Sequence, residues 1–181
     1  RLVSKLFESH ESALERIIQE DHQLGLDVPF GWEQAANKPN FYWMRRLEAS
    51  KEQDIFIYYE PYTSVETFDN IPALRDRITE RYLRDSEKPA LFITRQMRED
   101  IKAIFINQTQ FKGQYAKEAR GLWKISDNSV GGPYVSYTFV DQAQQRLYYI
   151  EGYVAAPGMN KRKLIMEVDA ILSTFNSRGL N

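Results

Sequence analysis

Acidic side chains on neighbouring predicted strands are the residues of this chain best suited to catalysis. Two pairs, Glu118 with Asp127 and Glu60 with Glu151, are placed so that they can converge across adjacent strands. A glycoside hydrolase requires such a pair, with one carboxyl group as acid and the other as base or nucleophile. Aspartate and glutamate account for 25 of the 181 residues, so pairs also arise by chance, and an ordinary surface role is the alternative for all four.

His10 and His22 are the two histidines, and both fall on a predicted N-terminal helix. At about 100° per residue they point about 120° apart, so they cannot share a helix face as metal ligands four residues apart do. Cysteine is absent, and neither HExxH nor GxSxG occurs. We therefore predict no metal site and no cofactor, with both histidines solvated or on the helix surface.

A glycine pair at Gly131 and Gly132, followed by Pro133, is the one segment that can present backbone donors to an anion. No helix follows to contribute its dipole, and no phosphate-loop pattern surrounds the pair. We predict a plain turn between two strands.

Four arginines, Arg75, Arg77, Arg81 and Arg84, give a second predicted helix a basic side. Acidic residues lie between them, which is typical of a solvated helix face. We expect no site for a polyanion on this helix.

Tyrosines are dense on the predicted strands, and tyrosine beside arginine is common at binding surfaces. The predicted interaction surface therefore consists of Tyr58, Tyr62, Arg120, Tyr134, Tyr149 and Tyr153. Tyrosine also favours strands for its own packing, so a place in the core is the alternative.

The composition limits the functions open to the chain. A length of 181 residues with 43% apolar content predicts a single domain over residues 1–181. The 24 basic and 25 acidic residues nearly balance, which argues against nucleic acid as a partner. No apolar run is long enough to span a bilayer. Because the chain opens on Arg1 in a helical pattern, we expect a fragment or a processed form.

The elements that must position these residues follow from hydrophobic spacing. We expect an amphipathic helix over residues 2–24, a hairpin of strands 41–48 and 54–60, and a helix from an Asn70 cap to about Leu83. Residues 90–100 fit a strand or a helical turn equally well.

The second half predicts a run of strands and a closing helix. Strands are expected over 105–111 and 114–125, joined by a tight turn at Lys112 and Gly113, and two more follow between turns. A helix is expected to start at Asn160, and its apolar face consists of Leu164, Ile165, Val168, Ile171, Leu172 and Phe175. This face should pack on an antiparallel sheet that contains Trp123, Val135, Tyr137 and Ile150. The fold class is α+β, a largely antiparallel sheet with about three helices.

Four runs of the sequence carry a family resemblance: IYYEPYTSVETF, GQYAKEARGLWKI, GGPYVSYTFVD and EGYVAAPGMNKRKLIMEVDAI. Together they resemble the C-terminal part of the domain-of-unknown-function family numbered 4837, found in lipoproteins of Bacteroidetes. The resemblance covers roughly residues 55–175. By analogy, the order of elements is also similar to the α/β/α sandwich of Mog1 and PsbP.

The resemblance implies a cell-envelope protein held by a lipid anchor that lies upstream of this sequence, and it transfers no catalytic residue. We therefore expect a noncatalytic envelope domain that binds a partner protein or a glycan. The alternatives are a glycan hydrolase with paired carboxylates and a purely structural spacer domain.

Overall fold

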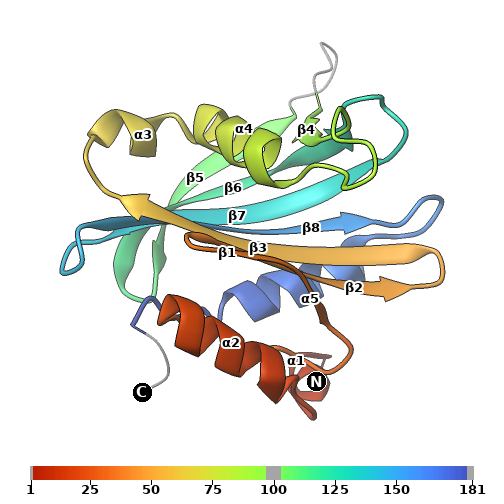
Figure 1. Cartoon of the computed structure of the whole chain (residues 1–181), viewed down its shortest axis with the longest axis horizontal. Coiled ribbons are helices and arrows are strands. Elements are labelled where there is room, and N and C mark those ends of the chain that lie inside the picture. The colour runs from red at the N-terminus through yellow and green to blue at the C-terminus, as the bar shows by residue number, and fades with distance from the viewer. Residues whose placement is uncertain (1, 97–102, 179–181) are drawn as a thin grey trace.

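The computed structural model describes residues 2–96 and 103–178, which form a single antiparallel sheet with helices on both faces (Figure 1). This confirms the α+β class, although the described residues contain five helices rather than three. The helices are α1 (Leu2–Leu6), α2 (Ser12–His22), α3 (Val65–Asp69), α4 (Ile71–Tyr82) and α5 (Arg162–Leu172). The strands are β1 (Glu33–Lys38), β2 (Phe41–Glu48), β3 (Lys51–Pro61), β4 (Ile93–Arg95), β5 (Ile104–Phe111), β6 (Gln114–Ile125), β7 (Gly131–Asp141) and β8 (Arg146–Ala155).

Six of the eight described strands follow the order β1-β2-β3-β8-β7-β6. The other two, β4 and β5, both pair with the outer edge of β6. β5 lies along the first part of β6, and β4 along its last three residues. Every pairing is antiparallel. β3 and β8 occupy the centre of the sheet, so both of their faces are available for burial.

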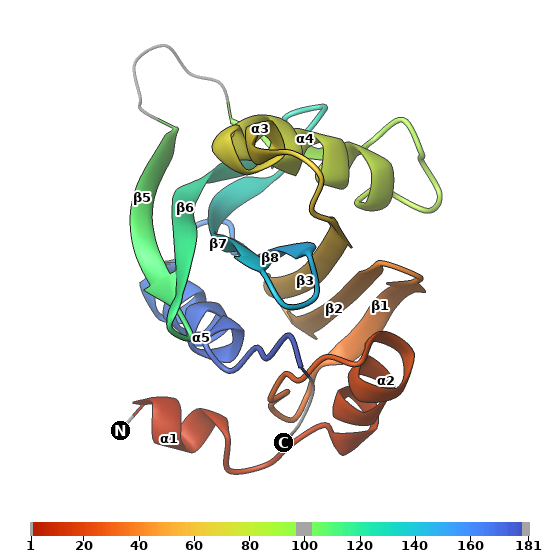
Figure 2. The ribbon, with the colours of Figure 1, turned by 90° about the vertical axis from the view of Figure 1, so that its left-hand side faces the viewer.

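One face of the sheet is covered by α2 and α5 (Figure 2). The spacing of apolar residues on α5 matches its predicted contact face, and β7 and β8 supply the complementary side chains. Buried residues of this face include Leu14, Ile18, Val135, Phe139, Ile150, Leu164, Val168, Ile171, Leu172 and Phe175. The predicted packing of the closing helix on an antiparallel sheet is thereby confirmed.

The opposite face is covered by α3 and α4 (Figure 2). Trp123 lies here, 3% exposed, so its predicted place in the core is confirmed while its side chain points away from α5. Most of the buried aromatic residues on this face come from the strands. Its core includes Phe41, Phe56, Tyr58, Phe68, Ile71, Leu74, Ile78, Tyr134, Tyr149 and Tyr153.

The N-terminal segment forms two helices, so the expectation of a single helix over residues 2–24 is wrong. The chain between α1 and α2 pairs instead with the segment that follows α2. Glu11 N–H donates to Val28 O at 2.8 Å, and Phe30 N–H donates to Ser9 O at 2.9 Å. These backbone bonds are incompatible with an uninterrupted helix, because the same groups would be needed inside it.

The predicted turn at Gly131–Pro133 is also wrong, because these residues begin β7. The reversal lies earlier, at residues 126–129. A Cβ atom on Gly132 would lie 1.9 Å from Val154 O, so the glycine is needed for the close approach of β7 to β8. Gly131 and Gly132 also pair with Lys124 and Trp123 of β6, so the segment is part of the sheet.

The helix caps and the tight turn agree with expectation. Asn70 Oδ1 accepts a hydrogen bond from Ala73 N–H at 3.2 Å at the start of α4. Lys112 and Gly113 join β5 to β6 with positive φ angles of 50° and 78°, as a two-residue hairpin requires. β1 was not predicted from the sequence. In the segment 90–100, which fitted a strand or a helical turn, residues 93–95 form the strand β4, and residues 97–100 lie outside the described residues.

Candidate functional site

The predicted tyrosine surface does not form a surface. Tyr58, Tyr134, Tyr149 and Tyr153 are between 0% and 4% exposed, because they point from β3, β7 and β8 into the core beneath α4. Burial raises the pKa of Tyr58 and of Tyr134 to about 12, so both hydroxyl groups stay protonated. The alternative of core packing holds for these four residues.

The remaining members of that predicted set lie apart from each other. Tyr62 is half-buried and lines a cavity of about 460 Å³ beside Phe68 and Tyr115. Arg120 belongs to the opposite face of the sheet, where it pairs with Glu118 at 2.9 Å and with Asp169 of α5 at 2.7 Å. The set therefore does not assemble into one site.

The predicted carboxylate pairs are separated in the same way. Glu60 pairs with Arg77 at 2.9 Å, and Glu151 with Arg75 at 2.7 Å, so each carboxylate binds an arginine of α4 rather than the other carboxylate. Glu118 is held by Arg120, while Asp127 is exposed in the turn beyond the far end of β6. Neither pair converges.

Arg75 is the exception to the predicted solvated face of α4. It is 1% exposed and donates from Nε and Nη2 to both carboxylate oxygens of Glu151, at 2.8 and 2.7 Å. Tyr149 OH donates to the same carboxylate at 2.5 Å, and the Tyr134 ring lies 4.1 Å from the guanidinium carbon. Burial alone would lower the pKa of Arg75, but the Glu151 carboxylate more than offsets this, so the pKa is raised.

The histidines have different environments. His22 is 3% exposed, so the expectation of a surface position is wrong for it; its ring nitrogens lie 2.9 Å from Tyr59 OH and 2.8 Å from Asn37 Oδ1. His10 is exposed and contacts Glu15 at 2.7 Å, which raises its pKa. Among the residues that the structure describes, no three histidine, aspartate or glutamate side chains are grouped as a metal site.

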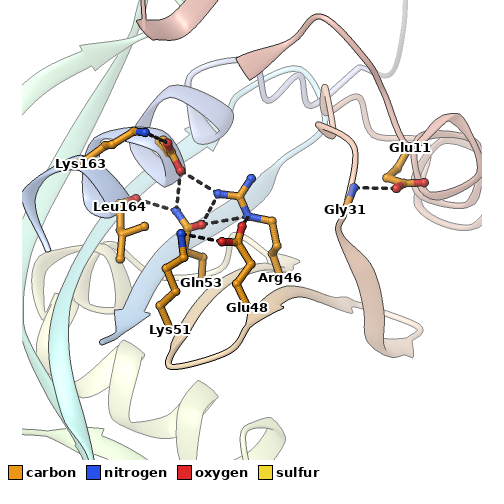
Figure 3. A network of polar contacts seen from close by, with 9 residues as sticks. Glu11, Gly31, Arg46, Glu48, Lys51, Gln53, Lys163 and Leu164 are labelled. Atoms are coloured by element: carbon orange, nitrogen blue, oxygen red, sulfur yellow. Dashed lines mark hydrogen bonds and ion pairs between the residues drawn. The ribbon is translucent and has the colours of Figure 1, made fainter. Parts of the chain in front are cut away.

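A polar network ties α5 to the β2–β3 hairpin on the same face as His22 (Figure 3). Glu167 Oε2 accepts from Arg46 at 2.7 Å and from Gln53 at 3.1 Å, and Gln53 Nε2 also donates to Leu164 O at 3.0 Å. Lys163 and Glu48 lie at its ends. These groups satisfy each other, so the network positions the helix rather than awaiting a ligand.

A pocket of about 490 Å³ opens at the end of the sheet where the segment following α4 crosses over it. β2, β6 and β8 supply its aromatic floor, and the 83–93 segment supplies the opposite wall. The apolar lining includes Trp43, Leu83, Leu91, Phe92, Ile93, Trp123, Ile125, Val130 and Tyr153. We call this cavity the aromatic pocket.

Two carboxyl groups of β3 lie at the aromatic pocket. Glu52 and Asp54 are two residues apart on one strand and so point to the same face; Glu52 lines the pocket, and Asp54 lies directly behind it. Asp54 Oδ1 accepts from Trp43 Nε1 at 2.8 Å, and Tyr153 is its cross-strand neighbour. Asp54 Oδ2 is buried and has no well-oriented hydrogen-bond partner in the described part of the chain.

Asp54 is held in its protonated form more strongly than an ordinary aspartate. Complete burial and the nearby Glu52 carboxylate raise its pKa well above the usual range. Its cross-strand neighbour on β2 is Arg45, but the Arg45 guanidinium instead pairs with Glu33 at 3.0 Å. On the β3 side the pocket therefore has a half-buried acceptor, Glu52, backed by a second carboxyl group that no cation neutralises.

Cationic side chains lie on the rim of the aromatic pocket. Arg45 and Arg84 both line it, and the Arg84 guanidinium carbon lies 5.0 Å from the centre of the Phe92 ring. A ligand in this pocket would meet the part-exposed side chains of Trp43 and Phe92, a carboxylate acceptor and guanidinium donors. That combination suits a small ligand carrying both hydroxyl groups and apolar faces.

Sequence reasoning missed this site for a local reason. Glu52 and Gln53 were assigned to a polar turn, whereas β3 begins at Lys51 and carries them in extended conformation. Counted with the strand, Glu52 and Asp54 alternate with the core residues Gln53 and Ile55, and that period of two could have identified a carboxyl pair on one face.

Comparison with known proteins places the chain in a family of undetermined function. A family model described as "Domain of unknown function (DUF4837)" matches residues 11–174. Among curated protein sequences none matches the chain. The family model thus covers all the described strands and the helices α2 to α5.

Solved structures share the fold at low sequence identity. A point mutant of the protein Mog1 has a TM-score of 0.51 with 9% identity, covering 86% of this chain and 91% of that one. The Ran-binding protein Mog1p of Saccharomyces cerevisiae gives 0.50 and 7%, covering 86% and 90%. LpqN, described as involved in cell envelope biogenesis of Mycobacterium tuberculosis, gives 0.49 and 12%, covering 84% and 82%. The Mog1/PsbP-like α+β fold is confirmed.

Proposed function

This chain belongs to the DUF4837 family, and from the geometry of the aromatic pocket we propose that it is a noncatalytic binding domain of the bacterial cell envelope whose ligand is a glycan. The observation that carries the proposal is the joint placement of Trp43, Trp123 and Glu52 around one cavity of about 490 Å³. In the described residues no helix has the length and apolar character needed to cross a membrane, and attachment through an upstream lipid anchor is part of the proposal.

A saccharide matches the aromatic pocket in both of its chemical characters. The C–H groups on the face of a sugar ring carry partial positive charge and pack against the electron-rich face of an aromatic ring. Its hydroxyl groups donate to carboxylates, and Glu52 is such an acceptor at the pocket. Long polyanions fit less well, because the pocket is lined by Glu52, Asp85 and Glu87 as well as by Arg45 and Arg84.

The hydrolase alternative now rests on a different pair of carboxyl groups from those that the sequence suggested. Glu52 and Asp54 combine a half-buried carboxylate that lines the pocket with a carboxyl group of raised pKa, as a glycosidase requires. Asp54, however, is 0% exposed and lies behind Trp43. A buried acid cannot reach a glycosidic oxygen, so binding without hydrolysis is favoured.

Binding can be measured through the tryptophans themselves. Trp43 and Trp123 line the aromatic pocket, whereas Trp32 is buried in the core on the other face. Titration with soluble peptidoglycan fragments, and separately with the oligosaccharide released from lipopolysaccharide, should shift the emission spectrum. Glu52→Gln should weaken the binding by about tenfold, because a charged acceptor becomes a neutral one.

The matched control is Glu60→Gln, which changes the same side chain on the same strand and face but outside the pocket. It should bind as the unmodified protein does. Mass spectrometry of the titrated glycans separates binding from hydrolysis, since a shortened product would establish the hydrolase. Absence of any spectral change with both glycan classes would leave the structural spacer as the better interpretation. Equal binding by Glu52→Gln would show that the glycan is held elsewhere than at the Glu52 side of the aromatic pocket.

A further inference from the structure

More acidic than basic side chains line the aromatic pocket. The charged residues at this cavity of about 490 Å³ are Arg45, Glu52, Arg84, Asp85 and Glu87. Both arginines are already paired, because Arg45 Nε lies 3.0 Å from Glu33 Oε1 and Arg84 Nη2 lies 3.6 Å from Glu80 Oε1. Glu33 and Glu80 lie outside the pocket lining, so acidic groups beyond the pocket offset the positive charge at its rim.

Glu52 has no such partner. Its cross-strand neighbours are Leu47 on β2 and Ala155 on β8, both apolar, whereas a cation directly opposite is the neighbour that stabilises a glutamate on a strand. Within the described ranges 2–96 and 103–178, no lysine or arginine forms an ion pair with Glu52. Its side chain is half-buried, so water and salt screen its charge less than they screen a surface charge.

Asp54 adds a second unpaired carboxyl group directly behind Glu52. It is 0% exposed, with Tyr153 opposite on β8, and the arginine opposite on β2 pairs with β1 instead. A buried carboxyl group without a cation lowers stability, and an asparagine here would avoid that cost while still accepting from Trp43 Nε1. The two carboxyl groups therefore create a negative potential at the pocket that no side chain of the described structure cancels.

Aromatic rings at the pocket add a second feature that attracts cations. Trp43 and Phe92 are part-exposed there, and the hydrogen bond from Trp43 Nε1 to Asp54 Oδ1 at 2.8 Å fixes the indole. The face of an aromatic ring attracts an ammonium group, and tryptophan does so most strongly. Phe92 already packs against the Arg84 guanidinium, whereas no described cation lies over Trp43. Unpaired carboxyl groups beside an available tryptophan ring are the features of a site for a cation.

We infer that the glycan bound in the aromatic pocket carries a free amino group, as an amino sugar without an acetyl group does. The inference rests on the proposed function, since it specifies the ligand of the same pocket. The ammonium group of the sugar lies within reach of the Glu52 carboxylate and the Trp43 ring, and it supplies the cation that Glu52 and Asp54 lack. An acetylated amino sugar has the same hydroxyl groups and ring but no charge, so it leaves both carboxyl groups unpaired.

The test compares two probes that differ at their nitrogen atoms. One is a short oligomer of glucosamine, and the other is the same oligomer with every amino group acetylated. At about pH 6 ordinary amino groups are protonated and ordinary carboxyl groups are ionised. Tryptophan emission and calorimetry at low salt should show the amine form bound about tenfold more tightly, because a hydrogen bond between two charged groups is stronger than one to a neutral amide.

Glu52→Gln shows whether the pocket is the source of this preference. The variant should bring the two dissociation constants to within about threefold of each other, because the charged acceptor is lost. The matched control is Glu60→Gln, which removes a carboxylate from the same strand outside the pocket and should keep the full preference. The melting temperature of each variant checks that it is folded.

Three outcomes would overturn the inference and leave glycan binding itself in place. The first is equal or tighter binding of the acetylated oligomer. The second is a preference for the amine that persists in Glu52→Gln, which would place the ammonium group elsewhere. The third is binding of peptidoglycan fragments by a protein that does not bind the amine oligomer. The proposed function fails by a different result, the absence of binding to peptidoglycan fragments, to the lipopolysaccharide oligosaccharide and to both oligomers.

Discussion

The face of the sheet under α5 and the face under α4 both exclude water, yet they place their charged groups differently. Under α5 the ion pair of Arg46 and Glu167 joins the helix to the β2–β3 hairpin through the neutral Gln53, with charged side chains 15% and 10% exposed. Under α4 the ion pair of Arg75 and Glu151 lies in the middle of the packed layer, with both side chains at most 1% exposed. The α4 face is also the face that contains the aromatic pocket.

The α4 face therefore depends on electrostatic pairing in a way that the α5 face does not. Apolar side chains can shift past one another at moderate cost, whereas a buried charge that loses its partner retains its full desolvation penalty. We expect the effects of substitutions under α4 on the free energy of unfolding to be strongly coupled in pairs. The effects of substitutions under α5 should follow the change in side-chain volume.

Arg75→Met is expected to have the largest effect, because it leaves Glu151 buried without a cation. Breaking a buried pair from one side costs about 3–5 kcal/mol. Chemical denaturation should show that loss in the single variant, and Arg75→Met with Glu151→Gln should recover more than half of it. A double variant as unstable as the single one would show that volume, not charge, dominates this face.

Gly152→Ala tests the α5 face and should have an intermediate effect. The added Cβ would lie 2.8 Å from Val168 Cβ, so α5 must move outward or the helix side chain must change. Overpacking of this kind costs about 1–3 kcal/mol. Combining it with Val168→Ala removes the Cγ2 contact at 2.9 Å but keeps the Cβ contact, so only part of the free energy of unfolding should return. No recovery would show that the Cβ contact alone sets the cost.

Asp54→Asn gives the smallest expected effect, visible mainly in its pH dependence. The unfolded chain ionises Asp54 above about pH 4, while the raised pKa keeps the folded group protonated to higher pH. The folded state then binds more protons, so Asp54 lowers stability as pH rises through this window. The variant should be more stable than the unmodified protein at about pH 7, with the gain lost at about pH 3.

The melting temperature of both proteins across that pH range is the measurement. Asparagine keeps an oxygen that can accept from Trp43 Nε1, so packing is preserved. A gain that is the same at every pH would point to packing rather than to proton binding as its cause.

Local patterns allowed much of this fold to be predicted. The Asn70 cap, the Lys112–Gly113 turn and the apolar spacing of α5 are properties of short segments, and the structure contains all three. Trp123 was assigned to the core by alternation along its strand, and it is buried. These features required no knowledge of distant neighbours.

The sites required such knowledge, and there the predictions failed. Alternation places Tyr149 and Tyr153 on one face of β8, but it does not show that β8 is a central strand covered on both faces. A central strand buries its tyrosines, whereas an edge strand would expose them. The aromatic pocket likewise depends on how the 83–93 segment crosses the sheet, which no local signal specifies.

The central pairing of β3 with β8 also has a consequence for how the chain folds. It joins two meanders, β1–β2–β3 and β5–β6–β7–β8, each made of hairpins between sequence neighbours, and it runs from Glu52 with Ala155 to Pro61 with Arg146. Hairpins close short loops, but this seam must close a loop that holds α3, α4, β4 and the strands β5, β6 and β7. The rate-limiting step of folding should therefore be the docking of two preformed halves. A chain cut within the exposed stretch 84–90 would leave both meanders whole, and its two fragments should reassemble along that seam.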